Sequence, residues 1–188
     1  MKRIVIGISG ASGAIYGIRM LEKLKEYSLA ETHLVVSRSA RATITAETDY
    51  TVAQVTALAD VAYDNNDLGA AISSGSFRTN AMIVAPCSIK TLSGIANSYD
   101  ESLLVRAADV ALKERMPVVA LLRETPLHRG HIRLMADATD AGLILMPPVP
   151  AFYTRPASVE DIVMHTVARA LDLVGIDLPH AKRWPLTT

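Results

Sequence analysis

Short aliphatic runs recur along the chain, and each is followed by a longer segment in which apolar positions repeat with a helical period. The runs cover residues 4–8, 33–36, 81–85, 118–122 and 143–146. Continuous Val, Ile and Leu over such lengths indicate strands buried on both faces, as in a parallel sheet covered by helices. The pattern predicts an α/β protein with a three-layer αβα fold, Rossmann-like or flavodoxin-like, around a central parallel sheet.

The segments between these runs carry their own start and stop signals. Helical periodicity covers residues 13–27, 103–115, 132–141 and 159–173. Ser158, with Asp161 three residues later, is a variant of the capping box that begins a helix. We expect one domain over residues 1–188, with a Pro-rich segment redirecting the chain after the last strand. We expect the tail from about residue 175 to pack on a neighbouring surface or subunit.

The composition limits which molecules or surfaces the protein is expected to bind. Nineteen Lys and Arg balance nineteen Asp and Glu, so no basic surface for nucleic acid or an anionic membrane is expected. Little charge repulsion and a mean hydropathy of +0.25 favour a homo-oligomer. No stretch approaches the ~20 apolar residues of a membrane span, and the single Cys87 cannot form an internal disulfide. A reduced, cytoplasmic protein is expected.

Small and hydroxyl-bearing residues follow three of the predicted strands. They lie in the turn 7–14, at Ser37 and Ser39, and in the segment 86–91. Ligands of open α/β sheets bind beyond the carboxyl ends of the strands, so these loops are expected to meet at one phosphate-bearing ligand. The glycine spacing is neither G-x-G-x-x-G nor a Walker loop. A tight structural turn and simple helix N-caps remain open as alternatives.

Cations recur at positions suited to a second phosphate. Arg106 and Lys113 lie seven residues apart, hence on one helix face, with Asp109 between them. Arg123-Glu124 closes a predicted strand at the ligand edge, and Arg169 lies on the final helix. Such a set could stabilise the charge on a departing phosphate. The alternative for each cation is a solvated surface residue.

Two further candidate sites, a nucleophilic cysteine and a metal site, have weaker support in the sequence. Cys87 has no histidine nearby in sequence to activate it, so a buried apolar role is favoured over a nucleophilic one. His128 and His131 could share a metal on a helix, but no third ligand completes a recognisable pattern. We therefore predict no metal.

Several motifs together resemble the UbiX-type flavin prenyltransferases, a family formerly described as phenylacrylic- or aromatic-acid decarboxylases. The resemblance spans residues 3 to about 184, and the long motif 106–115 with Arg123-Glu124 and the Phe-Tyr pair is the most specific part. The motifs are residues 9–14, 47–49, 74–76, 80–82, 86–88, 106–115, 123–126 and 150–153.

The resemblance implies an enzyme that binds reduced FMN and dimethylallyl monophosphate, and bonds the prenyl group to N5 and then C6 of the flavin. It implies a dodecamer with active sites at subunit junctions, and a UbiD-type decarboxylase as recipient of the prenylated FMN. It assigns FMN binding to Gly10, Ala11, Ser12, Ser37, Ser88, Ile89, Lys90, Thr91 and Arg123. It assigns substrate binding to Arg106, Lys113, Arg123, Glu124, Tyr153, Arg169 and Trp184. Catalytic roles fall to Ser12, Glu47, Lys113 and Glu124.

One position departs from the family pattern, because Leu68 stands where some relatives have an aromatic residue. The aromatic wall around the prenyl group then depends more on Tyr153 and Trp184, which affects prenyl-donor specificity. Two other functions remain as alternatives. One is an FMN-dependent decarboxylase of the cysteine-decarboxylase type, whose early catalytic His has no match here; the other is a non-enzymatic flavin carrier, which the neutral charge disfavours.

Overall fold

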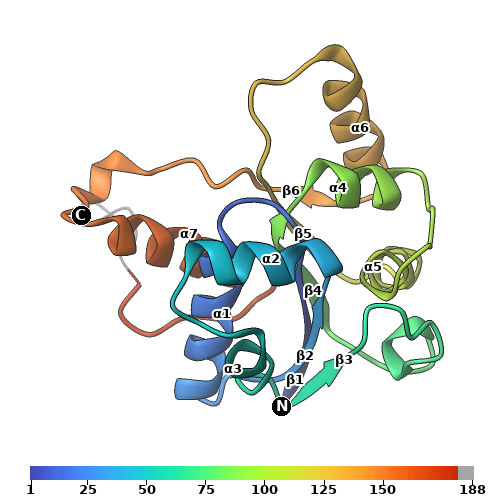
Figure 1. The fold of residues 1–188 in the computed structure, drawn as a ribbon, viewed down its shortest axis with the longest axis horizontal. Helices are drawn as coiled ribbons and strands as arrows, with labels where there is room; N and C mark the ends of the chain where they lie inside the picture. Colours follow the sequence, from blue (N-terminus) through green and yellow to red (C-terminus); the bar gives the residue numbers. More distant parts are fainter. Residues whose placement is uncertain (182–188) are drawn as a thin grey trace, which may run out of the picture.

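Six parallel strands form one sheet in the order β3-β2-β1-β4-β5-β6 (Figure 1). The computed structural model describes residues 1–181. The strands are β1 (Lys2–Ile8), β2 (Ala30–Val36), β3 (Val61–Tyr63), β4 (Ala81–Cys87), β5 (Val118–Leu122) and β6 (Ile144–Leu145). The chain moves outward in one direction from β1 to β3 and in the other from β4 to β6, so a crevice opens between the strand ends of β1 and β4.

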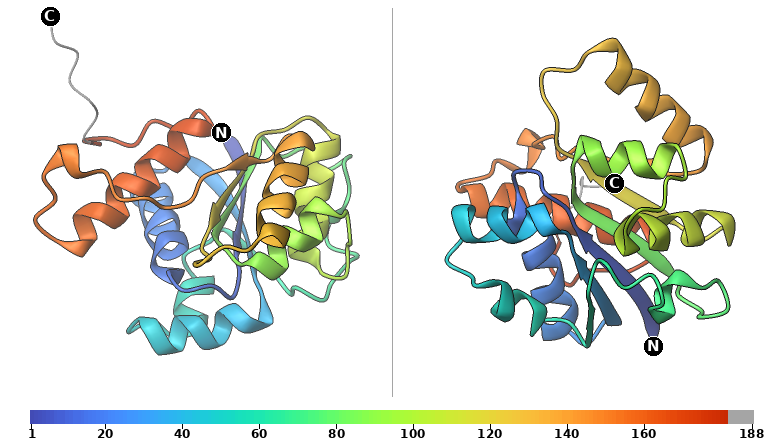
Figure 2. Two further views of the ribbon diagram at one scale, coloured as in Figure 1. Left: turned by 90° about the horizontal axis from the view of Figure 1, so that it is seen from above. Right: turned by 45° about the vertical axis from the view of Figure 1, so that its right-hand side comes forward.

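Helices cover both faces of the sheet, which gives the three layers visible in Figure 2. The helices are α1 (Ala14–Glu26), α2 (Arg38–Glu47), α3 (Val52–Thr56), α4 (Ile89–Ala96), α5 (Leu103–Lys113), α6 (Arg129–Asp140) and α7 (Val159–Leu173), with short 3-10 turns η1 (Ala71–Ser73) and η2 (Phe152–Thr154). Side chains of α1, α2, α3 and α7 share one apolar core, and those of α4, α5 and α6 share the other.

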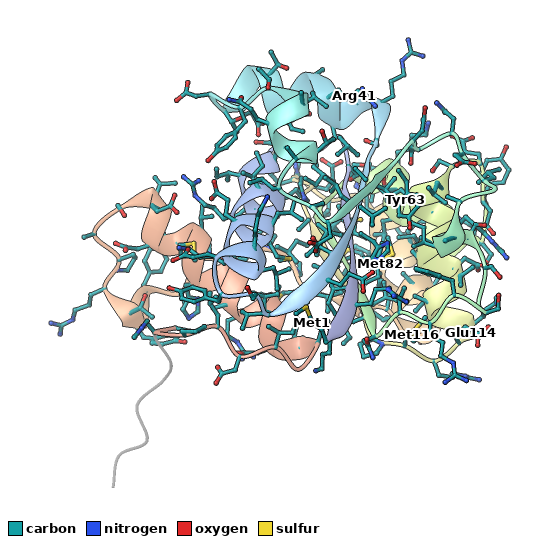
Figure 3. The ribbon with its side chains drawn as sticks, turned by 90° about the horizontal axis from the view of Figure 1, so that it is seen from below. Met1, Arg41, Tyr63, Met82, Glu114 and Met116 are labelled. Carbon is teal, nitrogen blue, oxygen red and sulfur yellow. The ribbon has the colours of Figure 1, made fainter. Side chains whose placement is uncertain are left out.

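The strands hold the layers together because their residues alternate between the two cores. Ile4, Ile6 and Ile8 face the core shared with α1 and α7, whereas Val5 and Met82 face the one shared with α5. All of them are fully or almost fully buried. Figure 3 shows Met82 in the middle layer, among the side chains that fill the space between sheet and helices. This double-sided burial fixes where the carboxyl ends of the strands point.

The structure confirms the predicted fold class and the five predicted strands, and adds the strand β3 and the helices α2, α3 and α4. The edge strand β3 is mostly exposed and only three residues long, and α3 is a five-residue helix that begins with a capping box at Thr51. The capping box predicted at Ser158 is present. The helix expected from residue 132 begins three residues earlier, at Arg129, where His128 accepts a hydrogen bond from the Gly130 N–H.

The first residues of the tail pack on the chain's own core. Ile176 and Leu178 are buried beside α7, and the Lys2 ammonium donates to the carbonyls of Val174 and Gly175 at the end of that helix. Over residues 1–181, no helix combines the length and apolarity that crossing a membrane requires.

Candidate functional site

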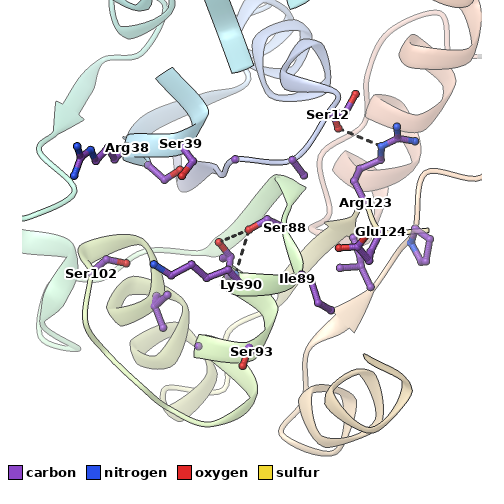
Figure 4. A pocket seen from close by; sticks show the side chains of 18 of the residues that line it. Ser12, Arg38, Ser39, Ser88, Ile89, Lys90, Ser93, Ser102, Arg123 and Glu124 are labelled. Carbon is purple, nitrogen blue, oxygen red and sulfur yellow. Dashed lines mark hydrogen bonds between the residues drawn. The ribbon is translucent and has the colours of Figure 1, made fainter. Parts of the chain in front are cut away.

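A pocket of about 1260 Å³ lies at the carboxyl ends of β1, β2, β4 and β5 (Figure 4). Parts of its wall come from the loops after β1, β2 and β4 that the sequence singled out, and another part comes from the Pro-rich segment 147–150. All nine residues expected to bind the flavin line it: Gly10, Ala11, Ser12, Ser37, Ser88, Ile89, Lys90, Thr91 and Arg123. The predicted loops therefore meet in one place, within one chain.

Two helices begin at this pocket. Ser37 caps α2 by accepting from the Ala40 N–H at 3.2 Å, and Ser88 caps α4 by accepting from the Thr91 N–H at 3.2 Å. Both serines are therefore N-caps as well as pocket residues. The first backbone N–H groups of a helix have no partner within it, so both helices direct donors and positive dipole ends at the pocket. An anionic group fits between them.

The floor of the pocket is made by a close approach of two chain segments. A Cβ atom on Gly10 would lie 2.2 Å from the Ser39 Cβ, so only glycine lets the first turn pass the start of α2. The buried Ser9 hydroxyl donates to the Pro86 carbonyl at 2.9 Å and accepts from the Ser88 N–H at 2.7 Å. Ser9 thus ties the β1 loop to the β4 loop.

The N-terminus of α1 already has an anion. Gly13 caps this helix with φ 101° and no side-chain hydrogen bond, and the Glu47 carboxylate, from the end of α2, accepts from the Gly13 N–H at 2.7 Å and the Ala14 N–H at 3.4 Å. A carboxylate here is favoured by the helix dipole. Glu47 thereby comes to lie against the turn that follows Ser12, but unlike Ser12 it does not line the pocket.

A polar cluster three residues beyond Glu47 ties the end of α2 to α1. The Tyr50 hydroxyl donates to Glu22, and Arg19 donates to Tyr50 at 3.2 Å and to Glu22 at 2.8 Å. The Glu22 carboxylate and burial both raise the pKa of Tyr50, so the phenol stays protonated. Arg19 also pairs with Glu160 of α7 at 2.8 Å, so the cluster joins α1, α7 and the segment that follows α2.

Arg123 and Glu124 follow β5 directly, beside the turn that contains Ser12. The Arg123 guanidinium donates from Nε to the Ser12 carbonyl at 3.1 Å, a contact marked in Figure 4. Glu124 accepts from the Thr125 N–H at 3.1 Å and, like Arg123, lines the pocket. An arginine, a carboxylate and a serine therefore come together at the point where β1 and β5 end.

The two cations on α5 lie elsewhere. Arg106 donates to Asp100 at 2.9 Å, to Asp109 at 3.1 Å and to the Ser73 carbonyl at 3.2 Å. Lys113 pairs with Glu114 at the C-terminal end of α5, and Figure 3 shows Glu114 far from Arg41 of α2. A Cβ on Gly75 would meet both Glu114 and Lys113. These residues form what we call the α5 cluster, around the loop 73–76.

The remaining predicted substrate residues form a second group, the α7 cluster. The Tyr153 hydroxyl of η2 is hydrogen-bonded to His165 Nε2 at 3.0 Å, and Arg169, one turn further along α7, pairs with Asp172 at 2.7 Å. Trp184 lies outside the described residues. Because α5 and α7 cover opposite faces of the sheet, the two clusters do not meet within one chain.

Cys87 and the pair His128 and His131, the two weaker candidates from the sequence, have different surroundings in the structure. Cys87 is completely buried, and burial raises the pKa of its thiol to about 12, so it is neutral and apolar at physiological pH. His128 and His131 stack with ring centroids 3.6 Å apart. Residues 1–181 hold no group of three or more His, Cys, Asp and Glu side chains placed to bind a metal.

Sequence reasoning missed the part of the pocket wall formed by Asn65, Tyr99, Glu101 and Ser102. Asn65 is also structural, because its carbonyl and side-chain oxygen accept from the N–H groups of Leu103 and Leu104 at the start of α5. It caps that helix from a loop nearly forty positions away. A local signal for this role does not exist in the sequence, since Ser102 stands at the N-cap position itself.

Comparisons with known proteins agree with this geometry. A family model described as Flavoprotein matches residues 1–170. The chain is 58% identical to the flavin prenyltransferase UbiX of Escherichia coli strain K12, over 98% of both chains. It is 57% identical to UbiX of Thauera aromatica, over 97% of this chain and 93% of the relative.

Solved structures of similar proteins superpose on this chain over nearly its full length. AnUbiX (PadA1), in complex with FMN and dimethylallyl pyrophosphate, superposes with a TM-score of 0.96 and 47% identity, over 100% of this chain and 99% of that one. A dodecameric FMN-dependent UbiX-like decarboxylase from Escherichia coli O157:H7 superposes with a TM-score of 0.95 and 48% identity, over 97% and 99%. A phosphopantothenoylcysteine-type (PPC) decarboxylase shares only the fold, with a TM-score of 0.61 at 19% identity, over 79% and 83%.

Proposed function

The chain belongs to the flavoprotein family and, within it, to the UbiX flavin prenyltransferases, and from this premise we propose that it transfers a dimethylallyl group from dimethylallyl monophosphate to N5 and then C6 of reduced FMN. The observation that supports the proposal is one pocket lined by all nine residues expected to bind the flavin, with Ser12, Arg123 and Glu124 among its lining residues and Glu47 bonded to the Gly13 N–H next to it. The decarboxylase and carrier alternatives are not favoured, since the high-identity relatives are prenyltransferases.

FMN fits the pocket that the chain supplies. Its phosphate is proposed to bind between the starts of α2 and α4, where Ser37, Ser39, Ser88 and Thr91 bring hydroxyls to the positive ends of two helix dipoles. The N-terminus of α1 is excluded as the phosphate site because the Glu47 carboxylate holds it. The bare backbone of Gly10 lets the flavin lie against the first turn.

Bound reduced FMN supplies the nucleophilic nitrogen and carbon of the reaction. The chain supplies proton transfer and charge. Ser12, which lines the pocket, and Glu47, which accepts from the neighbouring Gly13 N–H, are proposed to take up a proton that leaves the flavin. Arg123 is placed to stabilise the departing phosphate, and Glu124 to orient that phosphate or exchange a proton with it.

The two clusters outside the pocket support active sites shared between subunits. Arg106 and Lys113 on one layer and Tyr153 and Arg169 on the other cannot surround the same phosphate within one chain. Assembly into a dodecamer, the state named for the Escherichia coli O157:H7 neighbour, would let neighbouring copies supply them. We further propose a cytoplasmic protein whose prenylated FMN passes to a UbiD-type decarboxylase.

The proposal is tested by incubating the purified protein anaerobically with reduced FMN and dimethylallyl monophosphate, and recording the mass of the released flavin. A gain of one five-carbon prenyl unit is expected. Dimethylallyl pyrophosphate in a parallel reaction determines which donor is used. Unmodified FMN from folded, flavin-loaded protein with either donor would contradict the proposed reaction.

A further inference from the structure

An ion pair lies within the lining of the flavin pocket. The Lys90 ammonium, in the first turn of α4, pairs with the Glu101 carboxylate at 3.0 Å, and both residues line the pocket. Glu101 belongs to the loop between α4 and α5, and Figure 4 shows the Lys90 side chain extending toward Ser102, the next residue along that loop. Sequence reasoning gave Glu101 no role.

We propose that Glu101 is a positioning residue that holds Lys90 away from the flavin phosphate, and that it thereby keeps the flavin site weak enough to release its product. The inference rests on the proposed function, which makes FMN a substrate and places its phosphate between the starts of α2 and α4. It goes further by naming the residue that limits how tightly this phosphate is held. The observation that carries it is a carboxylate paired with a cation at the start of α4.

The charges around the proposed phosphate site are mostly positive. Two helices, α2 and α4, begin there and direct their positive dipole ends at the pocket. Arg38 and Lys90, in the first turns of these two helices, add two cations to the lining. Of the two carboxylates among the described lining residues, Glu124 follows β5, and Glu101 is the one paired with a cation of this site.

Glu101 opposes phosphate binding in two ways that have the same sign. A phosphate monoester is close to doubly charged at neutral pH, so the carboxylate repels it directly. Lys90 must also leave Glu101, or divide its three N–H donors between Glu101 and the phosphate, before it can contact the flavin. The pair is well exposed, with side-chain accessibilities of 84% for Lys90 and 47% for Glu101, so water screens both effects. The result is a modest weakening of phosphate binding.

The proposed reaction explains why a weaker phosphate site is useful. FMN and prenylated FMN carry the same phosphate, so any group that tightens the phosphate site tightens the binding of substrate and product alike. Uniform binding of this kind lowers KM without accelerating the chemical step, and it slows dissociation of the product. A carboxylate beside Lys90 therefore favours turnover over retention of the flavin.

The test compares wild type, Glu101→Gln and Lys90→Gln by fluorescence titration with oxidised FMN and with riboflavin, in the absence of a prenyl donor. Glu101→Gln is expected to bind FMN about 3- to 5-fold more tightly. Its affinity for riboflavin, which has no phosphate, should stay as in wild type. Lys90→Gln should bind FMN more weakly, again without a change for riboflavin.

Two further measurements follow the same variant. In about 1 M NaCl, where the Debye length is about 3 Å, most of the gain in FMN affinity of Glu101→Gln should disappear. After a single turnover in the anaerobic prenylation assay, Glu101→Gln should release prenylated FMN more slowly than wild type, by about the factor that it gains in FMN affinity.

Two controls separate positioning from a general effect of charge. Glu26→Gln is the matched variant, because Glu26 forms an exposed ion pair with Lys23 on α1, at 2.6 Å, and lies outside the pocket lining; it should change neither affinity. In a Lys90→Gln background, Glu101→Gln is expected to gain less FMN affinity than in wild type, since no ammonium remains to be released. An equal gain in both backgrounds would overturn the role of Glu101 as a positioning residue.

An FMN affinity that Glu101→Gln leaves unchanged or weakens would overturn the inference, and an equal change for riboflavin would make Glu101 a structural part of the pocket instead. If riboflavin binds too weakly to be measured, the salt dependence decides the question. Failure of the proposed function is a separate result, because it shows as flavin-loaded wild type that forms no product, whatever Glu101→Gln does to FMN binding.

Discussion

The flavin pocket and the two cation clusters use different chemistry to meet their ligands. The pocket combines backbone groups and hydroxyls at the ends of four strands with a few charged side chains such as Lys90 and Arg123, all within one chain. The clusters are charged side chains on outer helices, and each cation is already paired: Arg106 with Asp100 and Asp109, Lys113 with Glu114, Arg169 with Asp172. Because the buried sheet fixes the backbone of these loops, the pocket is expected to hold a flat cofactor without residues from another subunit.

A doubly charged phosphate requires several cations close together, and these repel one another when the phosphate is absent. Holding each cation on a carboxylate, on opposite faces of the sheet, avoids that repulsion in the free chain. The comparison predicts that flavin binding is a property of the single chain, whereas donor binding is a property of the assembly. The predictions below test this division.

The largest effect is expected from Glu47→Gln. The amide keeps the shape and can still accept from Gly13, but it loses proton transfer and the charge at the start of α1, so product formation should fall about 10²- to 10⁴-fold with FMN still bound. Single-turnover prenylation and FMN titration measure the two effects separately. The exposed neighbour Asp49→Asn serves as control. Loss of FMN from Glu47→Gln would instead make Glu47 a structural part of the pocket.

Gly10→Ala should weaken FMN binding roughly 10- to 100-fold, since overpacking of this kind costs about 1–3 kcal/mol. The added methyl group would meet the Ser39 Cβ at 2.2 Å, and the start of α2 would have to move. Fluorescence titration with FMN measures the loss. Gly69→Ala, whose nearest contact is the Asp67 carboxylate at 3.3 Å, is the matched control. Equal FMN affinities for the two variants would show that the pocket floor can yield.

Arg106→Lys addresses the other side of the comparison. The change keeps the charge but loses the planar fork that contacts Asp100, Asp109 and the Ser73 carbonyl. We expect KM for the prenyl donor to rise about 10-fold while FMN affinity stays as in wild type. Steady-state kinetics with saturating reduced FMN provide the measurement, and the exposed Arg41→Lys is the control. A change in FMN affinity would break the proposed division.

The smallest effect is expected from Cys87→Ala. Burial raises the pKa of this thiol to about 12, so it remains protonated throughout the working pH range and is no nucleophile. The variant should retain wild-type rates, with a stability loss of roughly 1 kcal/mol from the smaller side chain. Iodoacetamide at pH 8 should leave the native thiol unmodified and label it only after denaturation. Rapid labelling of native protein would contradict the buried environment.

Much of the flavin side could be predicted from sequence because its signals are local. The glycine turn, Ser37 and Ser88 each follow a strand-forming run closely in the sequence. Because the carboxyl ends of parallel strands lie at one edge of the sheet, these three segments are expected to meet there. The same logic failed for β3, whose residues Val61–Tyr63 are too few and too exposed to give a buried-strand pattern.

The long-range contacts could not be predicted from local patterns. Glu47 reaches the start of α1 across 34 positions, and Asn65 caps α5 from a distant loop. The spacing of Arg106 and Lys113 correctly placed both on one helix, but a helix period does not say which layer that helix joins or which carboxylates it meets. The family resemblance supplied those roles, and their geometry in the assembled enzyme remains a prediction.

The separation of the two clusters onto opposite layers has a genetic consequence. If each active site draws Arg106 from one copy and Arg169 from another, two inactive alleles, one altered at each position, would form mixed oligomers in which some sites inherit both intact residues. Such a pair of alleles would restore part of the activity that neither has alone. Selection would then act on the mixed oligomer and not on each chain separately.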